Sequence, residues 1–299
     1  MQRQQLTVSN AFTTGTRSVS SMDHARIRRD PIEWPNGARV AVTWTVIFEL
    51  FTGPSTGPDA VYTGSDSKYS LFGGRRGVWR LLDLLDAHQI KGSFPISGYA
   101  AEKFPSAVQE IRQRGHEIAG YGYATNRYLD ELPPNEERGD ILKTRDILER
   151  VSGTRPIGWI SPDLRPGDRT LEILAEAGIQ WNGDFPNDDL PYVIQVSGRP
   201  MVIIPYEKEA DDLELYQRHR QLPSALADSF IDGLDVLYEE GATHPKMLNV
   251  SLRAHLFGRA NGKMAIDRTI RYAKSLPAPG VWITTRTEIA QWWRQRGYS

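Results

Sequence analysis

The alternation of strand-like and helix-like segments is the feature that most constrains how this chain can fold. Short apolar runs, rich in β-branched residues and bounded by turn residues, are typical of buried strands. Such runs occupy residues 38–48, 92–96, 116–121, 156–160, 179–181, 201–205, 246–252 and 281–283. Apolar residues at helical spacing predict helices over residues 77–85, 100–114, 135–151, 169–177, 224–240 and 287–296. Most of the strands are therefore followed by a helix.

This order predicts an α/β fold, a distorted (β/α) barrel of about seven parallel strands. No shift in composition that would indicate a linker interrupts the alternation, so residues 22–299 are expected to form a single barrel domain. Residues 1–21 are polar, rich in Ser and Thr and without periodicity, which indicates a flexible N-terminal arm. Residues 50–76, rich in Gly, Pro, Ser and Tyr, are expected to form a long loop near a binding face.

Charge and composition exclude several classes of partner. The sequence has 36 Lys and Arg residues against 37 Asp and Glu residues, a net charge of −1, and its basic residues are dispersed. Nucleic acid and anionic membrane surfaces are therefore not expected as partners. No run approaches the roughly 18 apolar residues of a membrane helix. The chain has no cysteine, which excludes disulfides and thiolate metal sites and is compatible with the expected cytoplasmic location.

The carboxyl ends of parallel strands are where barrel enzymes place their chemistry. The residues that follow the predicted strands here include Glu49, Tyr121, Tyr123, Arg253 and His255. Because these ends meet at one face of a barrel, the five side chains are expected to lie close together. They are the first candidates for a functional site.

An ordered set of short motifs at these strand ends resembles the polysaccharide deacetylase (NodB-homology) superfamily. The likeness is greatest to the branch with the metal-independent allantoinases and cyclic imide hydrolases, and it spans roughly residues 30–295. The motifs are Trp34-Pro-Asn-Gly-Ala-Arg-Val-Ala-Val, Phe48-Glu49, Gly73-Gly-Arg-Arg-Gly77-Val-Trp-Arg, Gly115-His-Glu-Ile-Ala119, Gly158-Trp-Ile-Ser-Pro162, Asp188-Asp-Leu-Pro-Tyr192, Pro205-Tyr206, His255-Leu-Phe-Gly-Arg259 and Gly280-Val-Trp. Their joint order supports the barrel fold and the branch.

The resemblance implies an acidic base, often a metal held by an Asp and two His, an Arg that orients the base, and a late His as general acid. The chain departs from this pattern at four positions. Leu50 stands at the metal-binding acid, Tyr121 and Thr125 stand at the two His, and Ile160 stands at the Arg. These side chains cannot supply the ligands of a divalent ion. We therefore expect no catalytic metal and no other cofactor.

The remaining residues can still perform acid–base chemistry. Glu49, flanked by apolar side chains, is expected to be desolvated, which raises the pKa of a carboxyl toward the range of a general base. The alternative is a structural carboxylate paired with an Arg. His255 is the candidate general acid, against a hydrogen-bonded structural histidine. Arg253 would bind a substrate carboxylate or a developing oxyanion.

Further candidates would bind substrate. Arg75 follows a Gly-Gly turn and matches the branch's loop arginine, so it is a candidate anion-binding residue, with a solvated or structural arginine as the alternative. Six aromatic residues are expected near the same barrel end, although each one alone is more typical of the core than of a ligand contact: Trp44, Phe48, Tyr121, Tyr123, Trp159 and Trp181. Together they would wall a pocket for a small planar or ring-shaped molecule. A cation site at Asp184, Asp188 and Asp189 is weighed against loop capping, which we prefer.

These observations predict a metal-independent hydrolase of a C–N bond in a small cyclic amide or imide, with Glu49 as general base and His255 as general acid. A metal-free lyase or isomerase that uses the same pair on a small aromatic acid is one alternative. A catalytically inactive member of the family that only binds a ligand is another. Because relatives in this branch assemble, a homo-oligomer, a dimer or tetramer, is expected.

Overall fold

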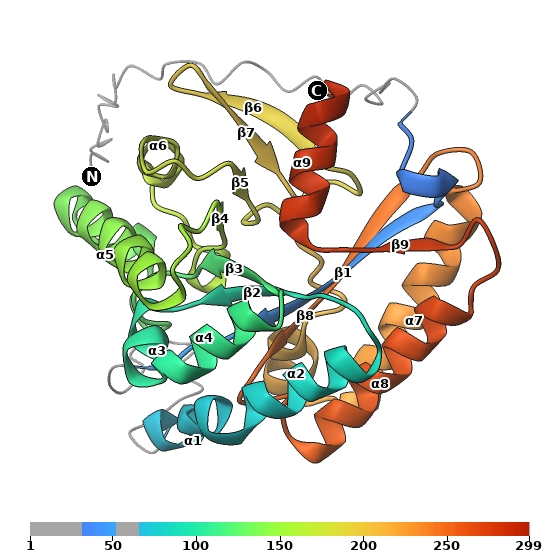
Figure 1. Cartoon of the computed structure of the whole chain (residues 1–299), viewed down its shortest axis with the longest axis horizontal. Helices are drawn as coiled ribbons and strands as arrows, with labels where there is room; N and C mark the ends of the chain where they lie inside the picture. Colours follow the sequence, from blue (N-terminus) through green and yellow to red (C-terminus); the bar gives the residue numbers. More distant parts are fainter. Residues whose placement is uncertain (1–31, 52–65, 299) are drawn as a thin grey trace, which may run out of the picture. The chain divides into compact units, whose positions relative to one another are not determined.

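A computed structural model describes residues 32–51 and 66–298, and all strands of this part belong to one curled, mostly parallel sheet (Figure 1). The order along the sheet is β6-β7-β5-β4-β3-β2-β1-β8, and β9 also pairs with β1. The strands are β1 (Val40–Ile47), β2 (Ser93–Ile96), β3 (Glu117–Gly120), β4 (Gly158–Trp159), β5 (Trp181–Asn182), β6 (Tyr192–Val196), β7 (Arg199–Ile203), β8 (Lys246–Arg253) and β9 (Val281–Ile283). The predicted α/β class and parallel barrel-like sheet are confirmed.

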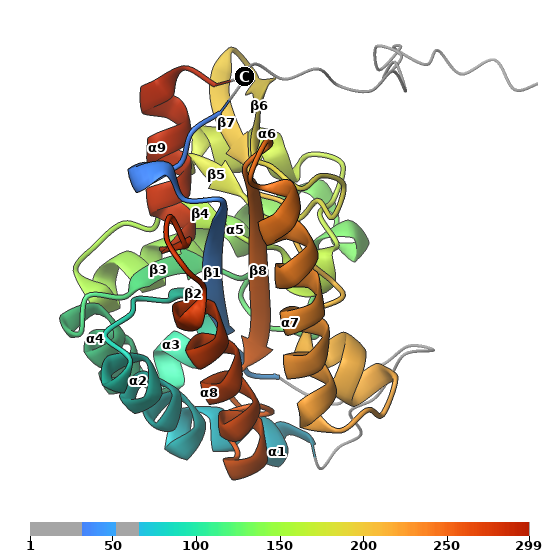
Figure 2. The same cartoon turned by 90° about the vertical axis from the view of Figure 1, so that its right-hand side faces the viewer.

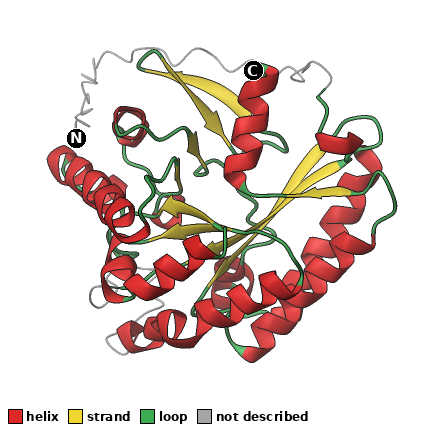
Figure 3. Ribbon diagram, viewed as in Figure 1, coloured by secondary structure: helices red, strands yellow, loops and turns green. Residues whose placement is uncertain are grey.

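Helices flank this sheet (Figure 3, helices red and strands yellow), and the last of them packs with residues of the inner row of β1. They are α1 (Asp66–Phe72), α2 (Val78–Ala87), α3 (Gly98–Lys103), α4 (Pro105–Gln113), α5 (Pro134–Ser152), α6 (Thr170–Glu176), α7 (Pro223–Glu240), α8 (Ala260–Ser275) and α9 (Arg286–Arg296). In Figure 2, α7 and α8 run beside β8 and β1. Short 3-10 or π-helical segments complete the described chain, among them η2 (Gly73–Gly77) and η5 (Leu213–Arg218).

The alternation of side chains along β1 explains how the sheet positions a site. Val40, Val42, Trp44, Val46 and Phe48 face the outer core formed with α2, α7 and α8. The odd-numbered residues face the other way, because side chains alternate along a strand. The odd-numbered row therefore points toward the inner face of the curled sheet.

Hydrogen bonds donated by one buried arginine identify that inner face. Arg286 Nε donates to Thr45 Oγ1 at 3.0 Å, and Arg286 Nη2 donates to Asn249 Oδ1 at 2.8 Å. Thr45 lies on β1 and Asn249 on β8, and the two strands pair in parallel with Thr45 opposite Ser251. These inner rows lead to Arg253 at the end of β8 and to Glu49 two residues past the end of β1.

Several predicted elements differ from the observed ones. Residues 66–76 were expected in a loop but form α1 and most of η2. The single helix predicted over 100–114 is two helices, α3 and α4, because Pro105 has no amide proton and begins a new helix. The hairpin strand β6 and the helix α8 were not predicted. β6 pairs antiparallel with β7, unlike the rest of the sheet.

The predicted N-terminal arm, residues 1–21, and the predicted domain boundary at residue 22 lie outside the described residues. Among the described helices, none combines the length and the apolar character that crossing a bilayer requires.

Candidate active site

A buried ion pair joins the ends of the two central strands. Arg253 is the last residue of β8 and stands opposite Ile47 in the register, while Glu49 follows two residues later on the same inner row. Arg253 Nε lies 3.5 Å from Glu49 Oε1. The two residues are only 4% and 2% exposed. Their predicted proximity at one end of the sheet is thus what the β1–β8 register produces.

The environment of Glu49 makes its carboxyl a weak acid. Burial raises the pKa of Glu49 to about 7, against the opposing effects of the Arg253 charge and of a hydrogen bond from Thr125. In that bond Thr125 Oγ1 donates to Glu49 Oε2 at 2.9 Å. A carboxyl with a pKa near neutrality can both take up and release a proton, as a general base must.

Two adjacent carboxylates hold Arg253 in place. Arg253 Nη1 donates to both oxygens of Asp211 at 3.0 and 3.1 Å and to Asp212 Oδ1 at 2.8 Å, and the Arg253 amide donates to Asp212 Oδ2 at 2.6 Å. Tyr206 Oη also donates to Asp211. Burial raises the pKa of Asp212 to about 7. The Arg253 guanidinium is therefore the positively charged partner of three buried carboxyl groups, those of Glu49, Asp211 and Asp212.

The sequence interpretation missed Asp211 and Asp212. The backbone explains their position: the Ser251 amide of β8 donates to Ala210 O at 3.0 Å, which aligns the following two residues with the end of β8. Asp211 also accepts hydrogen bonds from the amides of Leu213 and Glu214 at the start of η5. An Asp-Asp pair ahead of a helical turn is the sequence signal that could have indicated them.

His255 lies next to the pair but carries no extra proton at neutral pH. Its Nδ1 is 3.8 Å from Glu49 Oε1, and the rings of Phe51 and Tyr69 each meet the imidazole edge-on with centroids 6.0 Å away. Burial lowers the pKa of His255 to about 3, and the positive charges of Arg253 and Arg259 add to this effect. The ring is therefore a neutral neighbour of Glu49.

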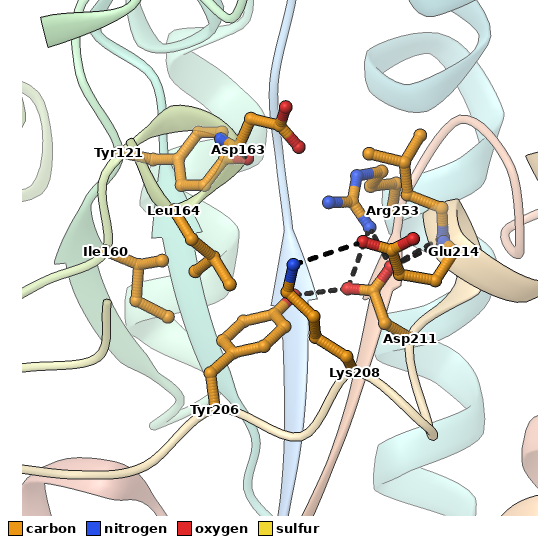
Figure 4. A pocket seen from close by; sticks show the side chains of 10 residues that line it. Tyr121, Ile160, Asp163, Leu164, Tyr206, Lys208, Asp211, Glu214 and Arg253 are labelled. Atoms are coloured by element: carbon orange, nitrogen blue, oxygen red, sulfur yellow. Dashed lines mark hydrogen bonds and ion pairs between the residues drawn. The ribbon is translucent and has the colours of Figure 1, made fainter. Parts of the chain in front are cut away.

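A small recess opens beside Arg253 (Figure 4). It is lined by Tyr121, Ile160, Asp163, Leu164, Tyr206, Lys208, Asp211, Leu213, Glu214 and Arg253. In Figure 4 the Tyr121 ring and the Arg253 guanidinium lie on opposite walls. The recess has a volume of about 10 Å³, close to the space that one buried water needs. Glu49 and His255 are not among the lining residues.

A strained turn forms one wall of this recess. Asp163 and Leu164 both have φ near +55°, which residues other than glycine rarely adopt. Arg218 Nη2 donates to both carboxylate oxygens of Asp163 at 2.7 and 2.8 Å. The Asp163 amide in turn donates to Tyr121 Oη at 3.3 Å. Arg218 thus holds the turn in place, and the Asp163 amide of the turn contacts the Tyr121 hydroxyl.

Arg75 lies elsewhere, in a second and larger groove. That groove has a volume of about 930 Å³ and is lined by Lys68, Tyr69, Leu71, Phe72, Arg75, Arg76 and Arg259. Arg259 stacks on Tyr69 and Phe72, with its guanidinium carbon 4.3 and 4.2 Å from the two ring centroids. The two recesses share no lining residue, so Arg75 and Arg253 do not line a common cavity.

Most of the predicted aromatic wall belongs to other parts of the molecule. Trp44, Trp159 and Trp181 are completely buried. Their indole nitrogens donate to Thr269 Oγ1, Ser161 Oγ and Thr287 Oγ1, respectively. Tyr123 donates to Glu102 at 2.9 Å and packs its ring against Lys143. Tyr121 is the one predicted aromatic residue that lines the recess, while the three indoles are packed into the hydrophobic cores.

The residues at the family's metal-binding positions do not fit a divalent ion. Leu50 is buried and aliphatic, the Thr125 hydroxyl donates to Glu49, and burial raises the pKa of Tyr121 well above its usual value, so its hydroxyl stays protonated. Within residues 32–51 and 66–298, no three His, Cys, Asp or Glu side chains are grouped to hold a metal. The cation among the buried carboxylates is Arg253.

The predicted cluster of three aspartates is dispersed. Asp184 is buried and accepts hydrogen bonds from the amide and hydroxyl of Ser161 at 2.5 and 2.7 Å. Asp188 Oδ1 accepts from the Leu190 amide at 3.1 Å, and Asp189 pairs with Lys246 at 2.9 Å. Asp188 therefore caps its loop, as expected.

Comparison with known proteins relates this geometry to one group of hydrolases. A sequence profile described as polysaccharide deacetylase matches residues 55–181. A structure of a probable polysaccharide deacetylase from Pseudomonas aeruginosa PAO1 is 30% identical with a TM-score of 0.78, over 88% of this chain and 93% of that one. A crystal structure of Puue allantoinase is 29% identical with a TM-score of 0.79, over 89% and 94% of the two chains. The peptidoglycan deacetylase of Helicobacter pylori is 27% identical over 50% of this chain and 53% of its own length.

Proposed function

The chain belongs to the polysaccharide deacetylase family of hydrolases, and from this we propose that it is a metal-independent hydrolase of a C–N bond in a small amide or imide. Glu49 is the general base of the proposed reaction and Arg253 binds the substrate oxygen. The observation that carries the proposal is the buried Glu49–Arg253 pair, in which an acid with a pKa of about 7 lies 3.5 Å from a fixed cation.

The proposed chemistry needs no group beyond these side chains and water. Glu49 takes a proton from a water molecule, and the water oxygen bonds to the carbonyl carbon. The carbonyl oxygen gains negative charge, which the Arg253 guanidinium stabilises because it is already positioned and desolvated. When the C–N bond breaks, the nitrogen takes the proton that Glu49 holds. The products are a carboxylic acid and an amine from an amide, or a carboxylic acid and a carboxamide from an imide. When the substrate is a ring, one molecule carries both groups.

We assign protonation of the leaving nitrogen to Glu49 rather than to His255. An imidazole with a pKa of about 3 has almost no imidazolium to donate at neutral pH. Glu49, in contrast, has just received a proton in the proposed reaction and lies 3.5 Å from Arg253, which lines the recess. His255 then serves as a neutral neighbour that keeps one side of Glu49 dry.

The small recess supports a substrate that presents a single compact polar group. Its volume of about 10 Å³ is far below the roughly 300 Å³ of an ordinary ligand pocket. One carbonyl or amide group of a substrate matches it better than a sugar ring with bulky substituents does. Cyclic amides and imides meet this condition, because their reacting carbonyl is exposed at the edge of a ring.

Purified full-length protein tests the proposal. Wild type is treated with a chelator and assayed with allantoin, hydantoin, succinimide and N-acetylated chitin oligomers, with identification of the product. We expect chelator-resistant ring opening of at least one cyclic substrate, and its loss in Glu49→Gln. Chelator-sensitive turnover would contradict the metal-free mechanism. Elimination or isomerisation products would favour a lyase or isomerase, and binding without turnover would favour a ligand-binding member.

A further inference from the structure

We propose that the Tyr121 hydroxyl donates a hydrogen bond to the negatively charged oxygen of the reacting group, opposite Arg253. Tyr121 follows β3, and its side chain lines the recess from the wall that faces Arg253 (Figure 4). Tyr121 and Arg253 would then form the two sides of an oxyanion site. This inference rests on the proposed function and adds to it a catalytic residue of a different chemical type.

The hydrogen bonds of the two tyrosines that line the recess distinguish their roles. Tyr206 donates its hydroxyl proton to Asp211, so this proton is already used. Tyr121 Oη accepts the Asp163 amide at 3.3 Å, which occupies a lone pair and leaves its proton available. No side chain or carbonyl in the described part of the chain accepts that proton. A hydroxyl that accepts from a fixed amide has a restricted orientation and is therefore a prepared donor.

Arg253 provides a second hydrogen-bond donor on the wall of the recess opposite Tyr121. Its Nη1 is bonded to Asp211 and Asp212, and its Nε faces Glu49. In Figure 4 the remaining terminal nitrogen of Arg253 is directed toward the side of the recess that holds Tyr121. An oxygen between them would receive one neutral and one charged hydrogen bond, and such donors are most effective where water is excluded.

The phenol suits this role because it keeps its proton. Burial, and to a smaller extent the negative charge of Glu49, raise the pKa of Tyr121 well above its usual value. The hydroxyl therefore donates without becoming an anion that would repel the substrate oxygen. Leu50, Thr125 and Ile160 offer no comparable donor to the recess, because Leu50 and Ile160 are aliphatic and Thr125 donates to Glu49.

Binding of methylphosphonate, a tetrahedral anion, tests the inference without any need for turnover. We expect wild type to bind it and Tyr121→Phe to bind about 10- to 100-fold more weakly, the effect of losing one hydrogen bond to a charged group. Tyr238→Phe is the matched control, since Tyr238 is also buried but donates to Pro277 O in another part of the fold. Absence of binding to wild type, equal binding by Tyr121→Phe, or an equal loss in Tyr238→Phe would each overturn the inference.

Measurement of turnover provides a second test of the role of Tyr121. With a substrate that wild type hydrolyses, Tyr121→Phe should lower kcat about 100-fold or more and change KM little. Unchanged kcat would overturn the inference while leaving the proposed hydrolase in place. Tyr121-dependent phosphonate binding without turnover would instead support the anion site and contradict the proposed function. If Tyr121→Phe does not fold, the carbon-13 shift of Tyr121 Cζ in wild type must change on addition of methylphosphonate, and an unchanged shift overturns the inference.

Discussion

Arg253 lies 3.5 Å from Glu49 on one side and bonds to Asp211 and Asp212 on another, so three buried acids share a single buried cation. With only one positive charge among three carboxyl groups, the fold favours retention of a proton within the cluster. The raised pKa values of Glu49 and Asp212, both about 7, have this common origin in burial. Two acids of the cluster therefore have pKa values near neutrality, the range that the proposed general base requires.

Loss of the cation should destabilise the fold. Arg253→Met keeps most of the side-chain volume but leaves the buried carboxylates without their partner. We expect the free energy of unfolding to fall by about 3–5 kcal/mol, the effect of removing one partner of a buried ion pair. Urea unfolding at pH 8 measures the difference. Arg155→Gln is the control, because Arg155 pairs with Glu149 in solvent and its loss should change stability by less than about 1 kcal/mol. Equal effects of the two substitutions would contradict the assignment.

The pH dependence of stability should change in Glu49→Gln. Burial raises the pKa of Glu49 from 4.5 to about 7 in the folded protein. The folded state therefore binds this proton more tightly than the unfolded state does. Protonation of Glu49 stabilises the fold fully below pH 4.5, and this stabilisation is lost as the pH rises through 7. We expect Glu49→Gln to gain stability relative to wild type between pH 4.5 and 8, by up to about 3 kcal/mol. Parallel unfolding curves of the two proteins over this range would show that Glu49 ionises normally.

His255 should remain neutral in mildly acidic solution. Burial lowers the pKa of His255 from 6.5 to about 3. As the pH falls below 6.5, this ring takes up a proton in the unfolded state but not in the folded state, so the free energy of unfolding decreases. In nitrogen-15 NMR spectra, we expect the His255 ring signals to keep the pattern of a neutral imidazole from pH 8 to 5. The exposed ring of His244 provides a reference in the same spectra. A His255 ring that gains a proton above pH 5 would restore it as a candidate general acid.

The contact between Gly77 and the segment after β8 should not tolerate a side chain. A Cβ on Gly77 would lie 1.9 Å from Ala254 O, and one on Gly258 would lie 2.3 Å from the Gly77 Cα. We expect Gly77→Ala to lower the free energy of unfolding by at least about 2 kcal/mol. Gly139→Ala is the matched control: Gly139 lies in α5 with no atom near its missing Cβ. It should gain about 0.5–1 kcal/mol, as measured by thermal unfolding.

Strand positions and their inward rows could be predicted from the sequence because they depend on local patterns. The apolar runs before Glu49 and Arg253 mark the two central strands, and a period of two then places both side chains on one face. The same local pattern could not show that Trp44, Trp159 and Trp181 belong to the core. An indole near a strand end can face either side, and neighbouring glycines such as Gly120 and Gly158, which lie against Trp159 and Trp181, decide which.

Tertiary contacts account for the elements that the sequence did not indicate. Residues 66–76 were expected in a loop partly because of their glycines, yet Gly73, Gly74 and the following Gly77 each lie directly against another segment, where a Cβ would not fit easily. That close packing offsets the conformational cost of glycine in a helical segment. Asp211 and Asp212 reach Arg253 through a backbone contact with β8, which no local pattern reveals. Metal independence, the homo-oligomer and the cytoplasmic location stay predictions.

The pairing of β1 with β8 also sets when the site can exist during synthesis. Glu49 leaves the ribosome roughly two hundred residues before Arg253, and β1 has its full-length partner only after β8 has emerged. Contacts between such distant segments carry a large loop-closure cost and form late in folding. A nascent chain therefore holds the base without its cation until nearly all of the chain has emerged. Truncation anywhere before residue 253 should yield a protein that lacks the site as a whole.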